Sequence, residues 1–404
     1  MTSKILTAFL LGLLMLFGIL ALSGIGLAAD SPEKVALGKT LFFDDDLSQP
    51  DGQSCATCHS PVFGFADPNH ILPVAQGVIR RFFGPRNTPS SAYAGFSPPL
   101  HWDPTPSIGN MMQGMYVGGL FWDGRTDTLE DQAQQPFLNP LEMHNPNKAA
   151  VVRAIRNSDY ASFFKFVFGP NSLKDVETAF QYAAEAIAAY ERSAEMNPFS
   201  SKFDLYLDGQ VQLTAAEANG LALFTGKAKC VNCHSMDSVP GVKPLFTNFG
   251  HQNIGVPANP ENLYYQMPAK FNAAGKNYVD LGLGEVLAER GDPNAGVPNA
   301  NAQKQNGKFK IPSLRNVART APYEHNGVFK TLREVVMFNN TRDVPAANWP
   351  PPEVPENVHR HMPMEPGFFG MLGLTDQEVS DIVAFLKTLT DGYLPGPRNQ
   401  GQNF

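Results

Sequence analysis

Two pentapeptides, "CATCH" at residues 55–59 and "CVNCH" at residues 230–234, decide the fold. They use all four cysteines of the 404-residue chain, and a histidine directly follows each cysteine pair. In Cys-x-x-Cys-His the two thiols bond the vinyl groups of a haem, and the adjacent imidazole reaches its iron. A disulfide needs no histidine, and a zinc knuckle or a redox dithiol explains two such copies less well. We therefore expect two covalently bound haem c groups, held by Cys55, Cys58, His59, Cys230, Cys233 and His234.

The composition is that of a folded globular protein. Hydrophobic residues make up 43% of the chain and charged residues 17%, which excludes an intrinsically disordered protein. The length suits about two to three domains of ordinary size. The formal net charge of −7 gives no reason to expect nucleic acid as a partner.

The first residues have the pattern of an export signal. Lys4 precedes an apolar run over residues 5–22, and small residues follow it as far as Ala29. The run is long for a cleaved signal, so a retained membrane anchor is the alternative interpretation. We predict a signal peptide over residues 1–29, cleaved near Ala28 or Ala29. The mature chain is then exported, in the periplasm, and meets the membrane only if the segment is retained.

A short pattern is repeated ahead of the two haem motifs. Residues 36–42, "ALGKTLF", and residues 218–224, "ANGLALF", both read Ala-x-Gly-x-x-Leu-Phe. Each is an apolar helical stripe with a glycine that allows close approach of a neighbouring element. The pairing indicates an internal duplication of one cytochrome-like unit.

Local signals predict several helices. Ser31 and Pro32 begin one as N-cap and first-turn proline, and a capping box at Thr214 begins another. A further capping box begins a terminal helix over residues 375–389. Residues 173–194 are amphipathic, rich in alanine and free of proline and glycine, which favours a long helix.

Long stretches rich in proline, glycine and asparagine separate these helices, and no run of alternating strands stands out. We predict a mainly α fold of two cytochrome c-like haem domains with long ordered loops. The predicted domains are residues 30–197, with the first haem motif, and residues 198–395, with the second haem motif. Residues 396–404 form a tail.

The chain resembles the bacterial di-haem cytochrome c peroxidase and MauG family over essentially its whole mature length. Any one of the matching segments would be weak, but together with two haem motifs in order they are specific. The segments are "ALGKTLFFDDDLS" (36–48), "CATCHSPVFGFAD" (55–67), "GPRNTPS" (84–90), "LFWDGRTDTLEDQAQQPFLNPLEM" (120–143), "CVNCHS" (230–235), "FTNFGHQNIGVPANPEN" (246–262), "FKIPSLRNVARTAPYEHNGVFKTLREVV" (309–336) and "GLTDQEVSDIVAFLKTLT" (373–390).

The resemblance implies roles for four residues. Trp122 matches a tryptophan that lies between the haems and helps electrons pass. Gln132 and Glu142 match the pair on the peroxide side of the N-terminal haem, and Pro136 matches a proline of that pocket. Cleaving a bound peroxide requires moving a proton from the near oxygen to the leaving oxygen, which a poised carboxylate can do. Without the resemblance, a core tryptophan, a surface glutamine and a helix-end glutamate are the plainer interpretations.

The resemblance also implies a calcium ion between the domains. Asn87, Thr320 and Pro322 match the residues of that site in the family. Side-chain amide oxygens and backbone carbonyls are hard donors that suit calcium. The alternative is that these are ordinary turn residues.

One departure from the family concerns the N-terminal haem. The cytochrome c peroxidases of the family carry a loop histidine that blocks this haem at rest, and Val78 stands at its place. His70 lies upstream and is interpreted as a solvated surface histidine. The resemblance is therefore closer to MauG-like members that lack the loop histidine, and we expect a five-coordinate N-terminal haem.

A second departure concerns the C-terminal haem. Relatives place methionine or tyrosine fourteen residues after the histidine that corresponds to His325, and this chain has Asn339 there. Asparagine is a poor ligand of haem iron. Met337 and His251 are other possible donors but do not match the pattern. The sixth ligand is left open by the sequence.

Three functions follow from the resemblance. The first is an exported di-haem peroxidase that uses hydrogen peroxide at an open N-terminal haem, with electrons relayed from the C-terminal haem. Its reductant is a small redox protein, cytochrome c or a cupredoxin, or residues of a protein substrate oxidised in a MauG-like reaction. The missing loop histidine favours the protein substrate. The alternatives are a peroxide-detoxifying cytochrome c peroxidase and a non-enzymatic di-haem electron-transfer protein.

Overall fold

A computed structural model describes residues 30–105, 114–291, 302–360 and 365–395. The predicted signal segment and the tail therefore lie outside the described residues. The prediction of a mainly helical protein is confirmed. No helix in the described part of the chain is long and apolar enough to cross a membrane.

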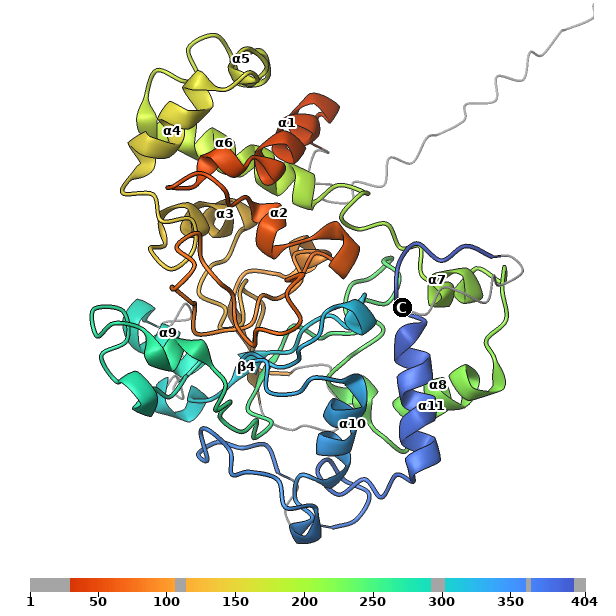
Figure 1. The fold of residues 1–404 in the computed structure, drawn as a ribbon. Coiled ribbons are helices and arrows are strands. Elements are labelled where there is room, and N and C mark those ends of the chain that lie inside the picture. The colour runs from red at the N-terminus through yellow and green to blue at the C-terminus, as the bar shows by residue number, and fades with distance from the viewer. Residues whose placement is uncertain (1–29, 106–113, 292–301, 361–364, 396–404) are drawn as a thin grey trace, which may run out of the picture.

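The helices are described in two groups by their order in the chain; Figure 1 shows the first group at the upper left, α7, α8 and α11 at the right, and α9 at the left. The first group, from the N-terminal half, consists of α1 (Pro32–Phe43), α2 (Cys55–Cys58), α3 (Leu129–Leu138), α4 (Lys148–Asn157), α5 (Ala161–Phe168) and α6 (Val176–Glu191). The second consists of α7 (Lys202–Leu207), α8 (Ala215–Thr225), α9 (Leu283–Arg290), α10 (Leu332–Thr341) and α11 (Asp376–Lys387).

The described residues also form two short antiparallel pairs of strands. In the first, β1 (His101–Asp103) pairs with β2 (Met115–Val117), so that Trp102 faces Tyr116. In the second, β3 (His251–Gln252) pairs with β4 (Phe309–Lys310). The sequence contained no alternating run that pointed to them, because strands of two or three residues are too short to show a period of two.

The predicted helix starts are confirmed. The Ser31 side chain accepts a hydrogen bond from the Lys34 amide, and Thr214 and Thr375 form complete capping boxes. The helix expected over residues 173–194 is shorter because Asp175 caps it, its carboxylate accepting from the Thr178 amide. The terminal helix ends at Lys387, two residues before the predicted end.

The repeated glycines lie where two helices cross. A Cβ atom added to Gly38 of α1 would stand 1.8 Å from the carbonyl oxygen of Ala186 in α6. A Cβ atom added to Gly220 of α8 would stand 2.0 Å from the carbonyl oxygen of Asp381 in α11. The two halves therefore carry the same steric requirement at the same place of the repeated pattern.

We expect Gly220→Ala to lower the free energy of unfolding by about 1–3 kcal/mol, because the added methyl group overpacks the crossing of α8 and α11. Denaturant unfolding of the haem-loaded protein measures the change. Ala216, exposed on the same helix, is the control, and Ala216→Ser should stay within about 0.5 kcal/mol of the parent. Equal effects of the two substitutions would contradict the close crossing.

Each half has its own apolar core. The first core contains Leu37, Phe180 and Tyr190, and the second contains Phe203 and Phe385 among other buried side chains. Aromatic rings pack edge to face in both; the rings of Phe203 and Phe385 lie 5.4 Å apart, for example. The predicted domain boundaries stay predictions.

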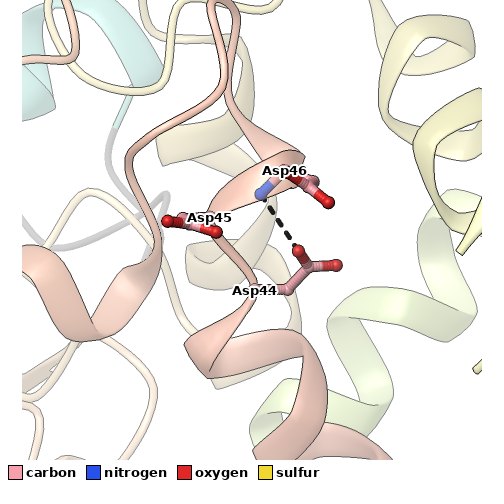
Figure 2. Close-up of side chains that lie close together, drawn as sticks. All are labelled: Asp44, Asp45 and Asp46. Atoms are coloured by element: carbon pink, nitrogen blue, oxygen red, sulfur yellow. Dashed lines mark hydrogen bonds between the residues drawn. The ribbon is translucent and has the colours of Figure 1, made fainter. Parts of the chain in front are cut away.

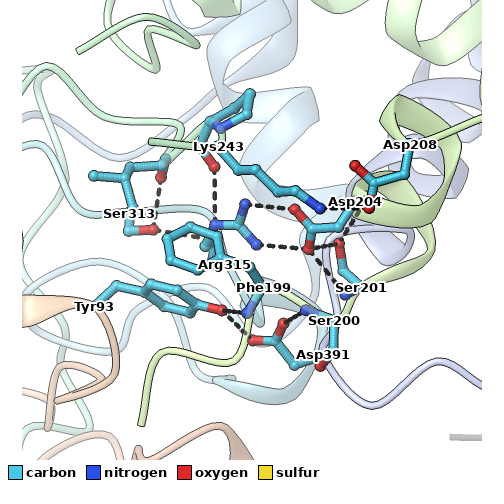
Figure 3. A network of polar contacts seen from close by, with 12 residues as sticks. Tyr93, Phe199, Ser200, Ser201, Asp204, Asp208, Lys243, Ser313, Arg315 and Asp391 are labelled. Atoms are coloured by element: carbon cyan, nitrogen blue, oxygen red, sulfur yellow. Dashed lines mark hydrogen bonds and ion pairs between the residues drawn. The ribbon is translucent and has the colours of Figure 1, made fainter. Parts of the chain in front are cut away.

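A buried polar network joins the two halves (Figure 3). Arg315 donates two hydrogen bonds of 2.9 Å to the Asp204 carboxylate, and both side chains are essentially inaccessible to solvent. The Tyr93 hydroxyl donates to Asp391 at 2.8 Å and accepts from the Phe199 amide at 3.0 Å. The first half thus contributes Tyr93 to a network whose other members named here lie between residues 199 and 391.

Asp44, Asp45 and Asp46 form an acidic turn after α1 (Figure 2). The Asp44 carboxylate accepts the Asp46 amide at 3.0 Å and receives the Tyr160 hydroxyl, so capping and tertiary contact account for its position. The neighbouring Asp44 charge raises the pKa of Asp46. Asp45 and Asp46 are exposed, and the turn is explained without a bound ion.

Candidate functional site

The structure holds the two motif histidines in the same way. The ring nitrogen Nδ1 of His59 lies 3.0 Å from the Phe65 carbonyl oxygen, and Nδ1 of His234 lies 2.9 Å from that of Phe246. Nδ1–H donates to each carbonyl, which leaves Nε2 as the nitrogen that can bind a metal. Burial lowers the pKa of both imidazoles, to about 4 for His234. Both are therefore neutral, as an iron ligand must be.

The backbone that presents these carbonyls is also duplicated. Phe65 and Phe246 both adopt the left-handed conformation, with φ of 59° and 55°. The hydroxyl of Ser90 donates to the Gly64 carbonyl at 2.6 Å, and the hydroxyl of Ser313 donates to the Leu245 carbonyl at the same distance. Each serine thus holds the residue before the carbonyl that orients a histidine. This second copy of the contacts supports the predicted duplication.

Each haem motif lines a cavity, and His59 of the first motif lines both cavities. The N-terminal cavity, of about 550 Å³, is lined by Cys55, Cys58 and His59. The C-terminal cavity, of about 280 Å³, is lined by Cys230, Cys233 and His234. Two thiols and an imidazole with a free Nε2 around one cavity are the donor set that a covalently bound haem requires. The residues therefore fit the two predicted haem groups.

The four cysteines are free thiols, as covalent attachment of haem requires. None of the four cysteines forms a disulfide. Burial raises the pKa of Cys55 and Cys230 to about 12, and that of Cys233 to about 11. The side chains are thus protonated thiols, and each thiol becomes a thioether when it adds across a vinyl group of the haem.

The two cavities share a wall, and each half completes the cavity of the other. Trp122 and Asn87 line both cavities. Tyr93 of the first half lines the C-terminal cavity, whereas Tyr264 and Tyr278 of the second half line the N-terminal cavity. The cofactor sites are therefore built across the boundary between the halves.

Trp122 is fixed within this shared wall. Its indole Nε1 donates to the Asn87 carbonyl at 2.9 Å, and its own carbonyl accepts from the Lys310 amide at 2.7 Å. The first bond anchors the side chain and the second anchors the backbone to β4. The indole consequently has one well-defined position between the two cavities.

The N-terminal cavity contains all three residues that the resemblance assigns to peroxide chemistry. Gln132, Pro136 and Glu142 line it together. Burial raises the pKa of Glu142, although the charge of Arg125 and a hydrogen bond from Asn139 act in the opposite direction. The side-chain oxygen of Gln132 is buried without a hydrogen-bond partner. The N-terminal cavity is thus lined by the Glu142 carboxyl, whose pKa is raised, and by the unpartnered amide oxygen of Gln132.

Sequence reasoning missed a second buried carboxyl at this cavity. Glu191, the last residue of α6, lines the N-terminal cavity, and its Oε2 has no hydrogen-bond partner. Burial raises its pKa to about 8. Nothing in the local sequence marks it, because a glutamate at the end of an amphipathic helix is usually solvated.

A buried charge cluster beside the shared wall was also missed. Arg86 donates to Asp280 at 2.6 and 2.8 Å and also to Asp123. Burial raises the pKa of Asp280, but the charge of Arg86 outweighs it, and the net pKa falls to about 2. Arg125 donates to Asp123 and lies 3.4 Å from the centre of the Phe121 ring. Arg86 and Asp280 thus join the two halves through an ion pair.

The three residues of the predicted calcium site come together. Asn87, Thr320 and Pro322 all line the C-terminal cavity. The amide nitrogen of Asn87 donates to the Pro73 carbonyl at 3.2 Å, which leaves the amide oxygen as the atom available to a cation. The donor set suits calcium, and the site stays a prediction.

The segment around Val78 brings no histidine to the N-terminal cavity. Val78 does not line it; its amide donates to the Glu142 carbonyl at 2.9 Å. Nδ1 of His70 lies 2.7 Å from the Ala321 carbonyl oxygen, and the residue is exposed. Within the described ranges, His59 is the only histidine that lines this cavity.

Of the three candidate donors for the second haem, only Asn339 lines the C-terminal cavity. Met337 packs against the second core. His251 is buried with Nδ1 3.3 Å from the Tyr116 carbonyl oxygen, and its ring lies against Gly124. Met337 and His251 are therefore badly placed to bind this iron.

Comparisons with known proteins agree with this site. Residues 32–212 match the family model described as di-haem cytochrome c peroxidase. The methylamine utilization protein MauG of Paracoccus denitrificans is 41% identical over 372 residues, which cover 88% of both chains. Cytochrome c551 peroxidase of Nitrosomonas europaea is 29% identical over 89% of this chain and 81% of its own.

A solved structure shows the same architecture. The di-haem peroxidase BthA of Burkholderia thailandensis superposes with a TM-score of 0.74 and 34% identity, over 90% of this chain and 87% of BthA. A MauG-like protein associated with microbial copper homeostasis superposes with a TM-score of 0.62 and 30% identity, over 90% of each chain. The chain belongs to the di-haem cytochrome c peroxidase and MauG family of peroxidase oxidoreductases, whose members carry two c-type haems.

Proposed function

We propose that the protein is an exported di-haem peroxidase that reduces hydrogen peroxide at the N-terminal cavity and oxidises residues of a partner protein. The reaction takes two electrons and two protons and converts one peroxide to two waters. The observation that carries the proposal is the content of the N-terminal cavity: His59, the buried carboxyl of Glu142 and the unpartnered amide oxygen of Gln132 line it together. A carrier needs a second strong ligand there, whereas a peroxidase needs space and proton-transfer groups.

Glu142 is the proton-transfer group. When bound, the N-terminal haem supplies the iron at which peroxide binds and the electrons that reduce it. Glu142 takes the proton from the near oxygen and returns it to the leaving oxygen, which departs as water. Burial raises its pKa, which makes its carboxylate a stronger proton acceptor than that of an ordinary glutamate. The Gln132 amide orients the peroxide by hydrogen bonding.

Trp122 relays electrons between the two haem sites. Its position in the shared wall, with the indole held by Asn87, supports this role. Asn87 also belongs to the proposed calcium site with Thr320 and Pro322. These residues would hold a calcium ion, which would stiffen the backbone that anchors the indole, so treatment with a chelator should impair the relay.

We expect Trp122→Phe to lower the rate of electron transfer between the haems roughly tenfold, which corresponds to about 1.4 kcal/mol in activation free energy. Phenylalanine is harder to oxidise and cannot donate to Asn87. Stopped-flow spectroscopy after addition of peroxide measures the transfer. Trp102, which packs on Tyr116 and lines neither cavity, provides the control Trp102→Phe. A relay that is unaffected in Trp122→Phe would exclude this role.

The experiment that tests the function compares two reductants. The haem-loaded protein is mixed with peroxide and either a reduced cytochrome c or cupredoxin, or a tryptophan- and tyrosine-bearing protein that forms a stable complex with it. Peroxide-dependent modification of the partner, seen by mass spectrometry, supports the proposal. Rapid turnover of the small redox protein without modification favours a detoxifying peroxidase instead. Mass spectrometry of the secreted N-terminus tests export and cleavage of residues 1–29.

The second candidate is a non-enzymatic electron-transfer protein. It requires both irons to be six-coordinate and low-spin at rest. A high-spin signal in the electron paramagnetic resonance spectrum of the ferric protein excludes it. We expect such a signal because no second histidine lines the N-terminal cavity within the described ranges.

A further inference from the structure

Helix α10 presents one face to the C-terminal cavity. Leu332, Val335 and Asn339 line the cavity, and their spacing of three and four residues places them on the same side of the helix. Met337 lies on the opposite side, since two residues correspond to about 200° of rotation, and it packs in the second core. Asn339 is therefore the polar residue on the cavity-lining face of this helix.

The Asn339 amide oxygen has nothing to bind within the protein. Oδ1 is buried and has no hydrogen-bond partner. The adjacent Asn340 differs: its amide nitrogen donates to the Leu374 carbonyl at 3.0 Å, and its oxygen accepts the Leu374 amide at 2.9 Å. Burying an unpartnered acceptor costs about 1–3 kcal/mol. The free oxygen of Asn339 thus points to a ligand of the cavity, whereas Asn340 serves the fold.

Two side chains that could bind iron strongly, His325 and Tyr323, line this cavity, and both contact neighbouring residues. His325 stacks on Phe309 with ring centres 3.6 Å apart, and its Nε2 lies 3.4 Å from the Glu353 carboxylate. The Tyr323 hydroxyl donates to the Val317 carbonyl at 2.9 Å. The Nε2 of His325 has no hydrogen-bond partner, but Phe309 covers one face of the ring and the Glu353 carboxylate lies beside that nitrogen.

The two lysines at the cavity are occupied as well. The Lys229 ammonium lies 4.8 Å from the centre of the Phe368 ring, and Lys310 donates to the Gly119 carbonyl at 2.9 Å. No methionine of the described residues lines the cavity. Glu324 also lines it, so a variant at this position is included among the controls.

We propose that the sixth position of the C-terminal haem iron is an exchangeable ligand site, faced by the Asn339 amide oxygen and open to small exogenous haem ligands. A neutral amide oxygen is a hard, weak donor, whereas haem iron is held firmly by imidazole, thioether or phenolate. A small anionic or neutral molecule therefore competes successfully with it. The inference rests on attachment of the second haem, which belongs to the proposed function, but not on the peroxide reaction.

Cyanide titration of the resting ferric protein tests the site. The protein is prepared with two haems per chain, and binding is followed by optical and electron paramagnetic resonance spectroscopy. We expect two equivalents of cyanide per chain in the parent. Asn339→Met should bind one equivalent and should gain a low-spin signal before cyanide is added, because a thioether then occupies the position.

Two control variants locate the donor. Met337→Leu should still bind two equivalents, because Met337 lies away from the cavity. Glu324→Gln should bind two equivalents as well, and a change of resting spin state only in this variant would assign the position to Glu324 and overturn the proposal. An Asn339→Met protein that retains two equivalents would also overturn it. If Asn339→Met does not fold, Asn339→Ala serves, with two equivalents expected.

A parent protein that binds one equivalent, with a low-spin second haem unchanged in Asn339→Ala, would overturn the proposal. Loss of that low-spin signal in Met362→Ala or Met364→Ala, outside the described residues, would then identify a methionine ligand. Peroxide turnover is measured in parallel on the same samples. An inactive protein that binds two equivalents refutes the proposed function alone, and an active protein that binds one refutes this inference alone.

Discussion

Glu142→Gln is expected to lower peroxide turnover by about 10²–10⁴-fold, the range that a positioned proton-transfer group contributes. Glutamine keeps the size of the side chain and its polar contacts but cannot carry a proton between the two peroxide oxygens. Steady-state turnover, with haem content checked by absorbance, measures the effect. Glu177→Gln is the control, because the Glu177 side chain is 71% exposed and lines neither cavity. A Glu142→Gln enzyme with parent activity would remove Glu142 from the mechanism.

The pH dependence should follow the same residue. Burial raises the pKa of Glu142 above that of an ordinary glutamate, so the carboxylate that accepts the first proton is lost at a higher pH than usual as the pH falls. Turnover of the parent should therefore decline on the acid side through this raised pKa. In Glu142→Gln the decline should be absent, and a persistent acid limb would assign it to another group.

Asp204→Asn is expected to lower the free energy of unfolding by about 3–5 kcal/mol. The substitution leaves the Arg315 guanidinium buried without its anionic partner, which is the costly way to break a buried ion pair. Arg315 would keep its bond to the Pro244 carbonyl and its contacts with the Tyr93 and Phe199 rings, but none of these neutralises the charge. Denaturant unfolding of the haem-loaded protein gives the change.

A neighbouring pair in Figure 3 offers the control. Lys243 donates to Asp208 at 2.7 Å, and both side chains are about one-third exposed. Asp208→Asn should cost about 0–1 kcal/mol, the usual range for an exposed ion pair. Equal destabilisation by the two substitutions would show that burial does not make the Arg315–Asp204 ion pair more costly to break than the exposed Lys243–Asp208 pair.

The haem attachment residues could be predicted from the sequence because covalent attachment needs five contiguous residues. The helix starts could be predicted for a similar reason, since a capping box spans only four residues, as at Thr214 and Thr375. Arg86 and Asp280 could not be paired, because 194 positions separate them. Glu191 was invisible because its importance comes from the cavity that other segments enclose around it.

Two residues depart from the family pattern, Val78 near the N-terminal haem site and Asn339 near the C-terminal one. Val78 and Asn339 could be identified by counting from neighbouring motifs, but what each substitution leaves behind depends on packing. The structure shows that Met337, two residues from the expected ligand position, faces the opposite side of α10. Proximity in sequence therefore said little about proximity to the cavity.

The wall shared by the two cavities has a consequence for biogenesis. The first haem motif emerges from the ribosome, and from any export channel, well before residues 264–290, which include Tyr264, Tyr278 and α9 at the rim of its cavity. The first haem must therefore be attached either before residues 264–290 complete its cavity or after the whole chain has been exported. We therefore expect that neither half matures as an independent module, and that expression of residues 30–197 alone yields a haem protein with an exposed, unstable cofactor.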